Sequence, residues 1–133
     1  MVENGRPHPT VLVVDDDPAV RNSLKFSLEL EGFAVRLYAD GRQLLDDPQL
    51  PPDGCLIVDQ VMPGMSGLDV VDAIRRRGMT YPAVLTISNA SPKLRDRAAM
   101  AGVAVIEKPF FGNELVDAIL DSLASIAIRR TAP

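Results

Sequence analysis

Short apolar runs alternate with longer segments of helical periodicity along almost the whole chain. The runs are rich in Val, Ile and Leu and show little alternation between apolar and polar residues, a composition typical of strands buried on both faces of a parallel sheet. They lie at 10–15, 33–39, 55–59, 82–88 and 103–107. We therefore predict that each run forms one strand of a single sheet.

The segments between these runs carry helix signals. In the first of them, Val20, Leu24 and Leu28 fall on one face of a helix, and Asp17 can cap it with Pro18 in the first turn. The predicted helices span 18–31, 40–47, 67–78, 92–101 and 114–128.

Strands and helices alternate without a break, which predicts an α/β fold with a parallel sheet covered by helices on both faces. Right-handed crossovers then lead to a doubly wound three-layer sandwich of five strands and five helices. We expect one domain at 9–128, a flexible leader at 1–8 and a tail at 129–133.

Composition excludes several classes of protein. The net charge is −4 and no long basic run is present, so we expect no direct contact with nucleic acid. The single cysteine, Cys55, excludes an internal disulfide and is consistent with a reducing cytoplasm. No apolar stretch is long enough for a membrane span. The only histidine, His8, lies in the leader, which argues against a histidine-based metal site or catalytic triad.

Acidic and basic residues stand at the ends of the predicted strands. Asp15 and Asp16 end the first strand, Asp59 ends the third, and Lys108 follows the fifth. In open α/β sheets, binding sites form at the carboxyl ends of the strands. Clustered carboxylates suit Mg²⁺, and a lysine beside them completes a constellation for phosphoryl transfer in which a carboxylate can itself accept phosphate. No P-loop is present, which disfavours a nucleotide-binding enzyme.

Three stretches of the chain resemble the receiver domain of two-component response regulators. They are VLVVDDDPAVR at 11–21, LIVDQVMPGMSGLDV at 56–70 and VIEKPF at 105–110. The resemblance extends over roughly 9–128 and implies the flavodoxin-like receiver fold. It also implies a cytoplasmic, single-domain response regulator that catalyses only its own phosphorylation and dephosphorylation. Its partners would be a cognate histidine kinase or phosphotransfer protein and a downstream protein target.

The resemblance assigns roles to individual residues. Asp59 would accept the phosphoryl group, and Mg²⁺ would be held by Asp15, Asp16, Asp59 and the backbone carbonyl of Val61. Lys108 would pair with Asp59 and then with a phosphoryl oxygen.

Loop geometry is also implied by the resemblance. Pro63 and Gly64 match the loop that follows the third strand, and Pro109 matches a proline whose preceding peptide bond is usually cis.

In the family, a Thr or Ser at the end of the fourth strand hydrogen-bonds the phosphoryl group, and an aromatic residue three positions before the lysine completes the conformational switch. The chain departs from the family pattern at this switch. In the family's usual register, the hydroxyl position of the fourth strand holds Ile87, with Thr86 and Ser88 on either side, and the aromatic position holds Val105. We therefore predict an altered switch. Either a bulge near Leu85 brings Thr86 to the phosphoryl group, or Ser88 reaches it from the loop, or the conformational response is weak.

Other functions remain open at this point. The altered switch favours a pseudo-receiver whose binding does not depend on phosphate. The chain could also be the receiver fragment of a transcription factor, and a small phosphohydrolase is the least favoured alternative. Apolar residues of the last helix cover more than the one face that would pack on the sheet. This excess suggests a homodimer through the fourth and fifth helices, a face that the family commonly uses.

Overall fold

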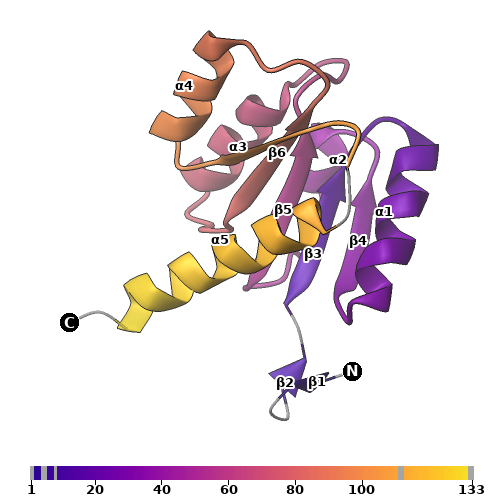
Figure 1. Ribbon diagram of the computed structural model, residues 1–133, viewed down its shortest axis with the longest axis vertical. Helices are drawn as coiled ribbons and strands as arrows, with labels where there is room; N and C mark the ends of the chain where they lie inside the picture. Colours follow the sequence, from indigo (N-terminus) through magenta and orange to yellow (C-terminus); the bar gives the residue numbers. More distant parts are fainter. Residues whose placement is uncertain (1, 4–5, 8, 111–112, 132–133) are drawn as a thin grey trace.

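The computed structural model describes residues 2–3, 6–7, 9–110 and 113–131, and its central element is a parallel sheet (Figure 1). The sheet contains β3 (Thr10–Val14), β4 (Ala34–Tyr38), β5 (Gly54–Asp59), β6 (Ala83–Ile87) and β7 (Ala104–Glu107). Their order is β4-β3-β5-β6-β7, and every neighbouring pair is parallel. The predicted doubly wound α/β fold is therefore confirmed.

Helices cover both faces of the sheet. They are α1 (Pro18–Leu30), α2 (Gly41–Leu45), α3 (Gly67–Arg76), α4 (Pro92–Met100) and α5 (Glu114–Thr131). Buried residues of α2, α3 and α4 pack against one face, and buried residues of α1 and α5 pack against the other. This three-layer arrangement leaves the carboxyl ends of the strands together at one edge of the sheet.

The predicted cap of the first helix is present, and a second helix is also capped. The Asp17 side chain accepts a hydrogen bond from the Ala19 N–H at the start of α1, with Pro18 in the first turn. Ser66 and Asp69 form a reciprocal capping box at the start of α3. These caps begin the helices directly after loops at the carboxyl edge of the sheet.

Two segments outside the expected domain contain regular structure. The chain before residue 8, expected to be a flexible leader, contains the two-residue strands β1 (Val2–Glu3) and β2 (Arg6–Pro7), which pair antiparallel. Helix α5 continues to Thr131, three residues into the expected tail. Arg and Thr can continue a helix without adding to its apolar stripe, so the end of the stripe did not mark the end of the helix.

No helix in the described part of the chain combines the length and apolar character needed to cross a bilayer.

Candidate functional site

Three carboxylates meet at the carboxyl edge of the sheet. One oxygen each from Asp15, Asp16 and Asp59 lies within 4.8 Å of the other two. Strands β3 and β5 are neighbours in register, with Val14 opposite Val58, so the acids that follow these residues are brought side by side. Asp15 and Asp59 are buried, whereas Asp16 is exposed. The structure therefore assembles the acidic cluster that the sequence predicts.

Lys108 brings a positive charge to this cluster from the end of β7. Its Nζ lies 3.3 Å from Asp15 Oδ2 and 3.5 Å from Asp59 Oδ1. The Lys108 N–H donates to the Ile87 carbonyl at 2.8 Å, which ties the backbone of this residue to the end of β6. The Lys108–Pro109 peptide bond is cis, as the resemblance implies.

Burial and charge shift the protonation equilibria of two of these groups. Burial raises the pKa of Asp59; the nearby Lys108 opposes this shift and the charge of Asp15 adds to it. Burial lowers the pKa of Lys108, but the carboxylates of Asp15 and Asp59 outweigh that effect and raise it overall. The lysine therefore stays charged, and the crowded acids favour a further cation.

Asp15 is held through both its backbone and its side chain. Its N–H donates to the Tyr38 carbonyl at 3.2 Å, and its Oδ1 accepts from the Asp17 N–H at 2.9 Å. Its carbonyl oxygen accepts a hydrogen bond from Arg21 Nη1 at 2.6 Å. This role of Arg21 could not be predicted from the sequence, because nothing in its spacing shows that its side chain turns back to the end of β3.

The loop after Asp59 is fixed by Gln60. The Gln60 carbonyl accepts from the Gly67 N–H at 3.1 Å, and its Oε1 accepts from the Leu68 N–H at 3.0 Å. Gln60 thereby ties the end of β5 to the start of α3. Sequence reasoning missed this role, since glutamine has no strong positional signature in a loop.

Within that loop, Val61 is 71% exposed beside the acidic cluster. Gly64 follows Pro63 and has φ +80°, a conformation that L side chains rarely adopt. A glycine at this turn is consistent with the loop geometry expected from the resemblance.

The register of β6 decides which hydroxyl lies beside Asp59. The β5–β6 ladder runs without interruption from the Leu56–Ala83 pair to the Asp59–Thr86 pair, so no bulge is needed at Leu85. Residues paired in a parallel ladder point to the same face of the sheet. Thr86 is therefore the neighbour of Asp59 on its own face, and it is only 1% exposed.

Ile87 and Ser88 have different surroundings. Ile87 is buried in the core formed with α2, α3 and α4, against which the partly buried Val105 also packs. Ser88 is exposed just after the end of β6. Ile87 and Val105 thus share one apolar core, and Thr86, not Ile87, is the residue of β6 that lies on the side of Asp59.

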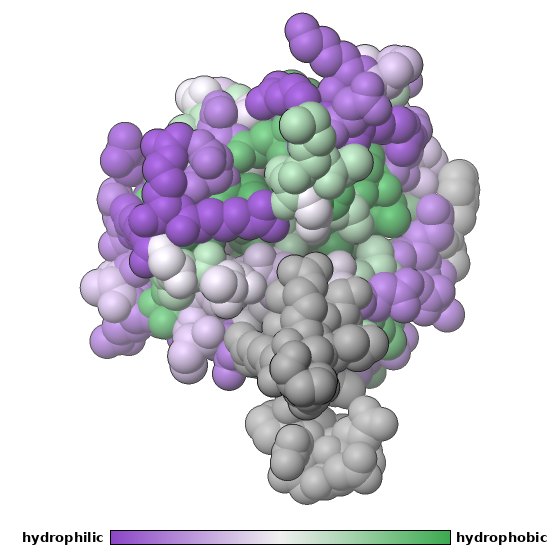
Figure 2. All heavy atoms as spheres, turned by 90° about the vertical axis from the view of Figure 1, so that its left-hand side faces the viewer, coloured by the Kyte–Doolittle hydropathy of each residue, from purple (hydrophilic) through white to green (hydrophobic). Residues whose placement is uncertain are grey.

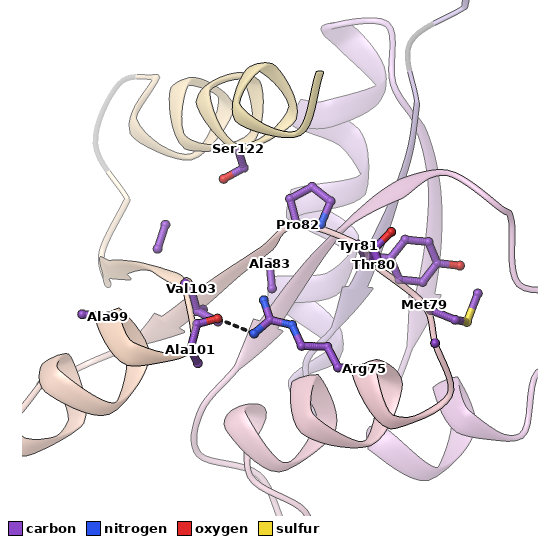
Figure 3. Close-up of a pocket in the computed structure, with 13 residues that line it drawn as sticks. Arg75, Met79, Thr80, Tyr81, Pro82, Ala83, Ala99, Ala101, Val103 and Ser122 are labelled. Carbon is purple, nitrogen blue, oxygen red and sulfur yellow. Dashed lines mark hydrogen bonds between the residues drawn. The ribbon is translucent and has the colours of Figure 1, made fainter. Parts of the chain in front are cut away.

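A hollow of about 590 Å³ lies away from the acids (Figure 3). It is lined by the segments that precede β6 and β7, at the opposite ends of these strands from Asp59 and Lys108. Figure 3 shows the Arg75 guanidinium in this hollow, where it donates a hydrogen bond to the Ala101 carbonyl, with Ser122 of α5 on the other side. The hollow is therefore not part of the acidic site.

The fold and the acidic site together define a receiver-type α/β domain. Comparison with known proteins agrees, since residues 11–120 match the family of the response regulator receiver domain. The chain belongs to this family.

Relatives with sequence similarity include transcriptional regulators. The chain is 38% identical over 119 residues to the C4-dicarboxylate transport transcriptional regulatory protein DctR of Rhodobacter capsulatus, covering 87% of this chain and 60% of the relative. It is 35% identical over 118 residues to the transcriptional regulatory protein FixJ of Azorhizobium caulinodans, covering 88% of this chain and 56% of the relative. The chain thus spans little more than half the length of these relatives.

Solved structures show the same fold. The response regulator StyR matches with a TM-score of 0.81 and 35% identity, over 92% of this chain and 62% of that one. The structure named FixJ-N matches with a TM-score of 0.77 and 31% identity, over 86% of this chain and 93% of that one.

Proposed function

We propose that this domain accepts a phosphoryl group on Asp59 from a histidine kinase or phosphotransfer protein, with Mg²⁺ as cofactor. The observation that carries this proposal is the meeting of Asp15, Asp16 and Asp59 within 4.8 Å, with Lys108 in contact with two of them. The domain would catalyse only its own phosphorylation and dephosphorylation, and otherwise act by binding.

The donor set fits Mg²⁺, which prefers hard oxygen ligands and uses one or two carboxylates together with water and phosphate oxygens. Asp15, Asp16, Asp59 and the Val61 carbonyl would hold the ion. When bound, Mg²⁺ would neutralise charge on the phosphoryl oxygens. A further cation also relieves the repulsion that contributes to the raised pKa of Asp59.

Protein groups supply the rest of the chemistry. A carboxylate oxygen of Asp59 forms a bond to phosphorus as the phosphorus–nitrogen bond of the donor phosphohistidine breaks. The Lys108 ammonium, 3.5 Å from Asp59 Oδ1, is placed to pair with a phosphoryl oxygen. Among nearby hydroxyls, Thr86 is in register with Asp59, and Ser88 is exposed at the edge of the sheet. Both are candidate phosphate contacts.

We further propose that the conformational switch is altered. A ligand shifts a conformational equilibrium only through contacts that differ between the two states. Thr86, in register with Asp59, supplies a hydroxyl on the face of the site, but Val105, on the opposite face of the sheet with Ile87, has no aromatic ring to reorient. The response to phosphorylation would therefore depend on Thr86, Ser88 and Lys108 without an aromatic partner.

The face formed by α4 and α5, which both contact β7, is the proposed site of self-association. On the side of the molecule where α4 lies, apolar residues form a patch between polar ones (Figure 2). Strand β7 is one of the two edge strands of the five-stranded sheet and is only partly buried at Val105 and Ile106. Met100 at the end of α4 is 90% exposed. Exposed apolar surface of this kind is typical of interaction sites.

Regulation of transcription is the output that the relatives favour. The matched proteins DctR and FixJ are named transcriptional regulatory proteins. That this chain itself makes no contact with nucleic acid stays a prediction. A change in transcript levels between cells carrying the parent and the Asp59→Asn variant would support this output.

Phosphate uptake tests the primary function. The parent, incubated with Mg²⁺ and a small acyl phosphate such as acetyl phosphate, should gain one acid-labile phosphoryl group by intact mass. Asp59→Asn should gain none. Uptake that persists in this variant would overturn the assignment of Asp59, and no uptake by the parent would favour a phosphate-independent binding module.

Asp17→Asn is the matched control. It removes a carboxylate two positions from Asp15, and asparagine can still cap α1. The Asp17 side chain accepts the Ala19 N–H and is not part of the acidic cluster. Phosphate uptake should therefore be retained.

A further inference from the structure

Arg21 holds the peptide group that joins the two adjacent acids of the site. Its Nη1 donates to the Asp15 carbonyl oxygen at 2.6 Å. This oxygen belongs to the peptide unit between Asp15 and Asp16, and that unit is planar. Fixing the oxygen therefore restricts the direction in which the chain enters Asp16.

The hydrogen bond from Arg21 lies just past the end of the β3–β4 ladder. The β3–β4 ladder ends at the Val14–Tyr38 pair, and the Asp15 N–H makes a last bond to the Tyr38 carbonyl. Beyond that point β4 has ended and the next segment of its chain begins α2. The Arg21 side chain supplies the donor for the Asp15 carbonyl just past the end of this ladder.

The position of Arg21 is itself well determined. Its backbone N–H donates to the Asp17 carbonyl at 3.0 Å in the first turn of α1, and Asp17 caps that helix. The backbone of Arg21 thus contacts one end of the acidic segment and its side chain contacts the other. These two hydrogen bonds flank Asp16, whose side chain is exposed.

We propose that Arg21 is a positioning residue for the Mg²⁺ site, which rests on the function proposed above. It would keep the Asp16 carboxylate directed toward Asp59 before the ion binds. Preorganisation of this kind lowers the cost of ordering ligands when the metal arrives.

Charge and positioning predict opposite effects of removing Arg21. The side chain is a cation near a cluster of acids, so electrostatics alone predicts that Mg²⁺ binds more tightly without it. Loss of positioning predicts weaker binding, because the Asp15–Asp16 peptide is then free to rotate. The sign of the change therefore separates the two roles.

Mg²⁺ titration of Arg21→Ala tests the proposal. Binding would be followed by the amide NMR shifts of the 15–17 segment at constant ionic strength. We expect the dissociation constant to increase about tenfold, the scale of a lost hydrogen bond from a charged donor. Lys25→Ala is the matched control, since it removes the same charge from α1 and Lys25 contacts Glu29 and not Asp15. This control should bind Mg²⁺ at least as tightly as the parent.

Two further measurements keep the result interpretable. Arg21→Lys retains the charge and a donor, and its affinity should lie closer to that of the parent than to that of Arg21→Ala. Without Mg²⁺, the Asp16 and Asp17 amides should exchange faster in Arg21→Ala while the strand amides stay protected, which shows that the fold is intact.

The outcomes are distinct. Unchanged or tighter Mg²⁺ binding by Arg21→Ala would overturn the positioning role. If the parent does not bind Mg²⁺, the metal site of the proposed function fails, and the inference about Arg21 is then decided by amide exchange. Unchanged exchange at Asp16 and Asp17 would overturn it.

Discussion

Lys108 Nζ lies 3.5 Å from Asp59 Oδ1, so the end of β7 brings a cation to the acid that ends β5. Strand β6 lies between these two strands, and the lysine side chain spans its end. The same Nζ is 3.3 Å from Asp15 Oδ2. Lys108 is thus the protein's own counter-charge for the two buried acids.

Replacement of Lys108 by Met should strengthen Mg²⁺ binding. The change removes a cation that competes with the metal for the same carboxylates. We expect the dissociation constant to fall about fivefold, because the free energy gained is a small part of the Coulomb energy between two charges at this separation. In the absence of Mg²⁺, the variant should unfold at a lower temperature because the acids lose their counter-charge. Calorimetry of Mg²⁺ binding and thermal unfolding measure these two effects.

Lys93→Met is the control for Lys108. Lys93 is exposed on α4, so its loss should change neither quantity appreciably. Weaker Mg²⁺ binding by Lys108→Met would show that the lysine organises the site and does not compete with the ion.

Gly67→Ala should destabilise the domain and disturb Asp59. A Cβ at Gly67 would lie 2.5 Å from Leu85 Cδ1 and 2.7 Å from the Asp59 carbonyl oxygen. Backbone atoms cannot move aside as a flexible side chain can, so we expect a loss of about 2 kcal/mol in the free energy of unfolding. Urea unfolding measures the loss, and the Asp59 amide shift reports the local displacement.

Gly64→Ala, in the loop that precedes α3, provides a comparison. Nothing lies within 4 Å of a Cβ at Gly64, and the cost comes only from its φ of +80°. We expect a loss of about 1 kcal/mol and a smaller shift at Asp59. Equal effects of the two variants would contradict the steric explanation for Gly67.

Ile87→Thr should lower stability without strengthening the conformational response to phosphorylation. The new hydroxyl enters the apolar core beside α4, which should cost about 1–3 kcal/mol. It lies on the face of the sheet opposite to Asp59, so it is not placed to contact a phosphoryl oxygen there. Hydrogen exchange with and without acetyl phosphate should show the same change in α4 and β7 as in the parent.

Thr86→Val is the matched variant on the other face of the sheet. Thr86 is in register with Asp59 and lies opposite to the side that Ile87 occupies. Loss of its hydroxyl should reduce the response to phosphorylation. A larger response in Ile87→Thr than in the parent would contradict this assignment of Thr86.

Tyr38 should make stability depend on pH under alkaline conditions. Burial raises the pKa of Tyr38 to about 12, and the hydrogen bond from its hydroxyl to Asp47 adds to this shift. The unfolded chain loses this proton near pH 10. The stabilisation is therefore complete below about pH 10 and is lost as the pH rises toward 12.

Ring NMR signals of the tyrosines test this prediction. The chain has two tyrosines, so Tyr38→Phe and Tyr81→Phe assign the signals. The Tyr38 signal should titrate near pH 12, and Tyr38→Phe should flatten the fall in stability between pH 10 and 12. A Tyr38 midpoint near 10 would contradict the expected effect of burial.

Much of the fold and of the site could be predicted from local patterns. Apolar runs predict buried strands because both faces of a parallel sheet are covered. Asp15, Asp59 and Lys108 could be placed at one edge because parallel strands end on the same side. These inferences need only periodicity and chain direction.

The tertiary structure alone decided the register of β6 and the contacts that cross the site. A shift of one residue exchanges the two faces of a strand, so sequence could not say whether Thr86 or Ile87 lies on the face of Asp59. The ladder places Thr86 there and buries Ile87 on the other side. The contact of Arg21 with the Asp15 carbonyl depends on how α1 packs at the end of β3, since a long side chain has many rotamers and only packing selects one.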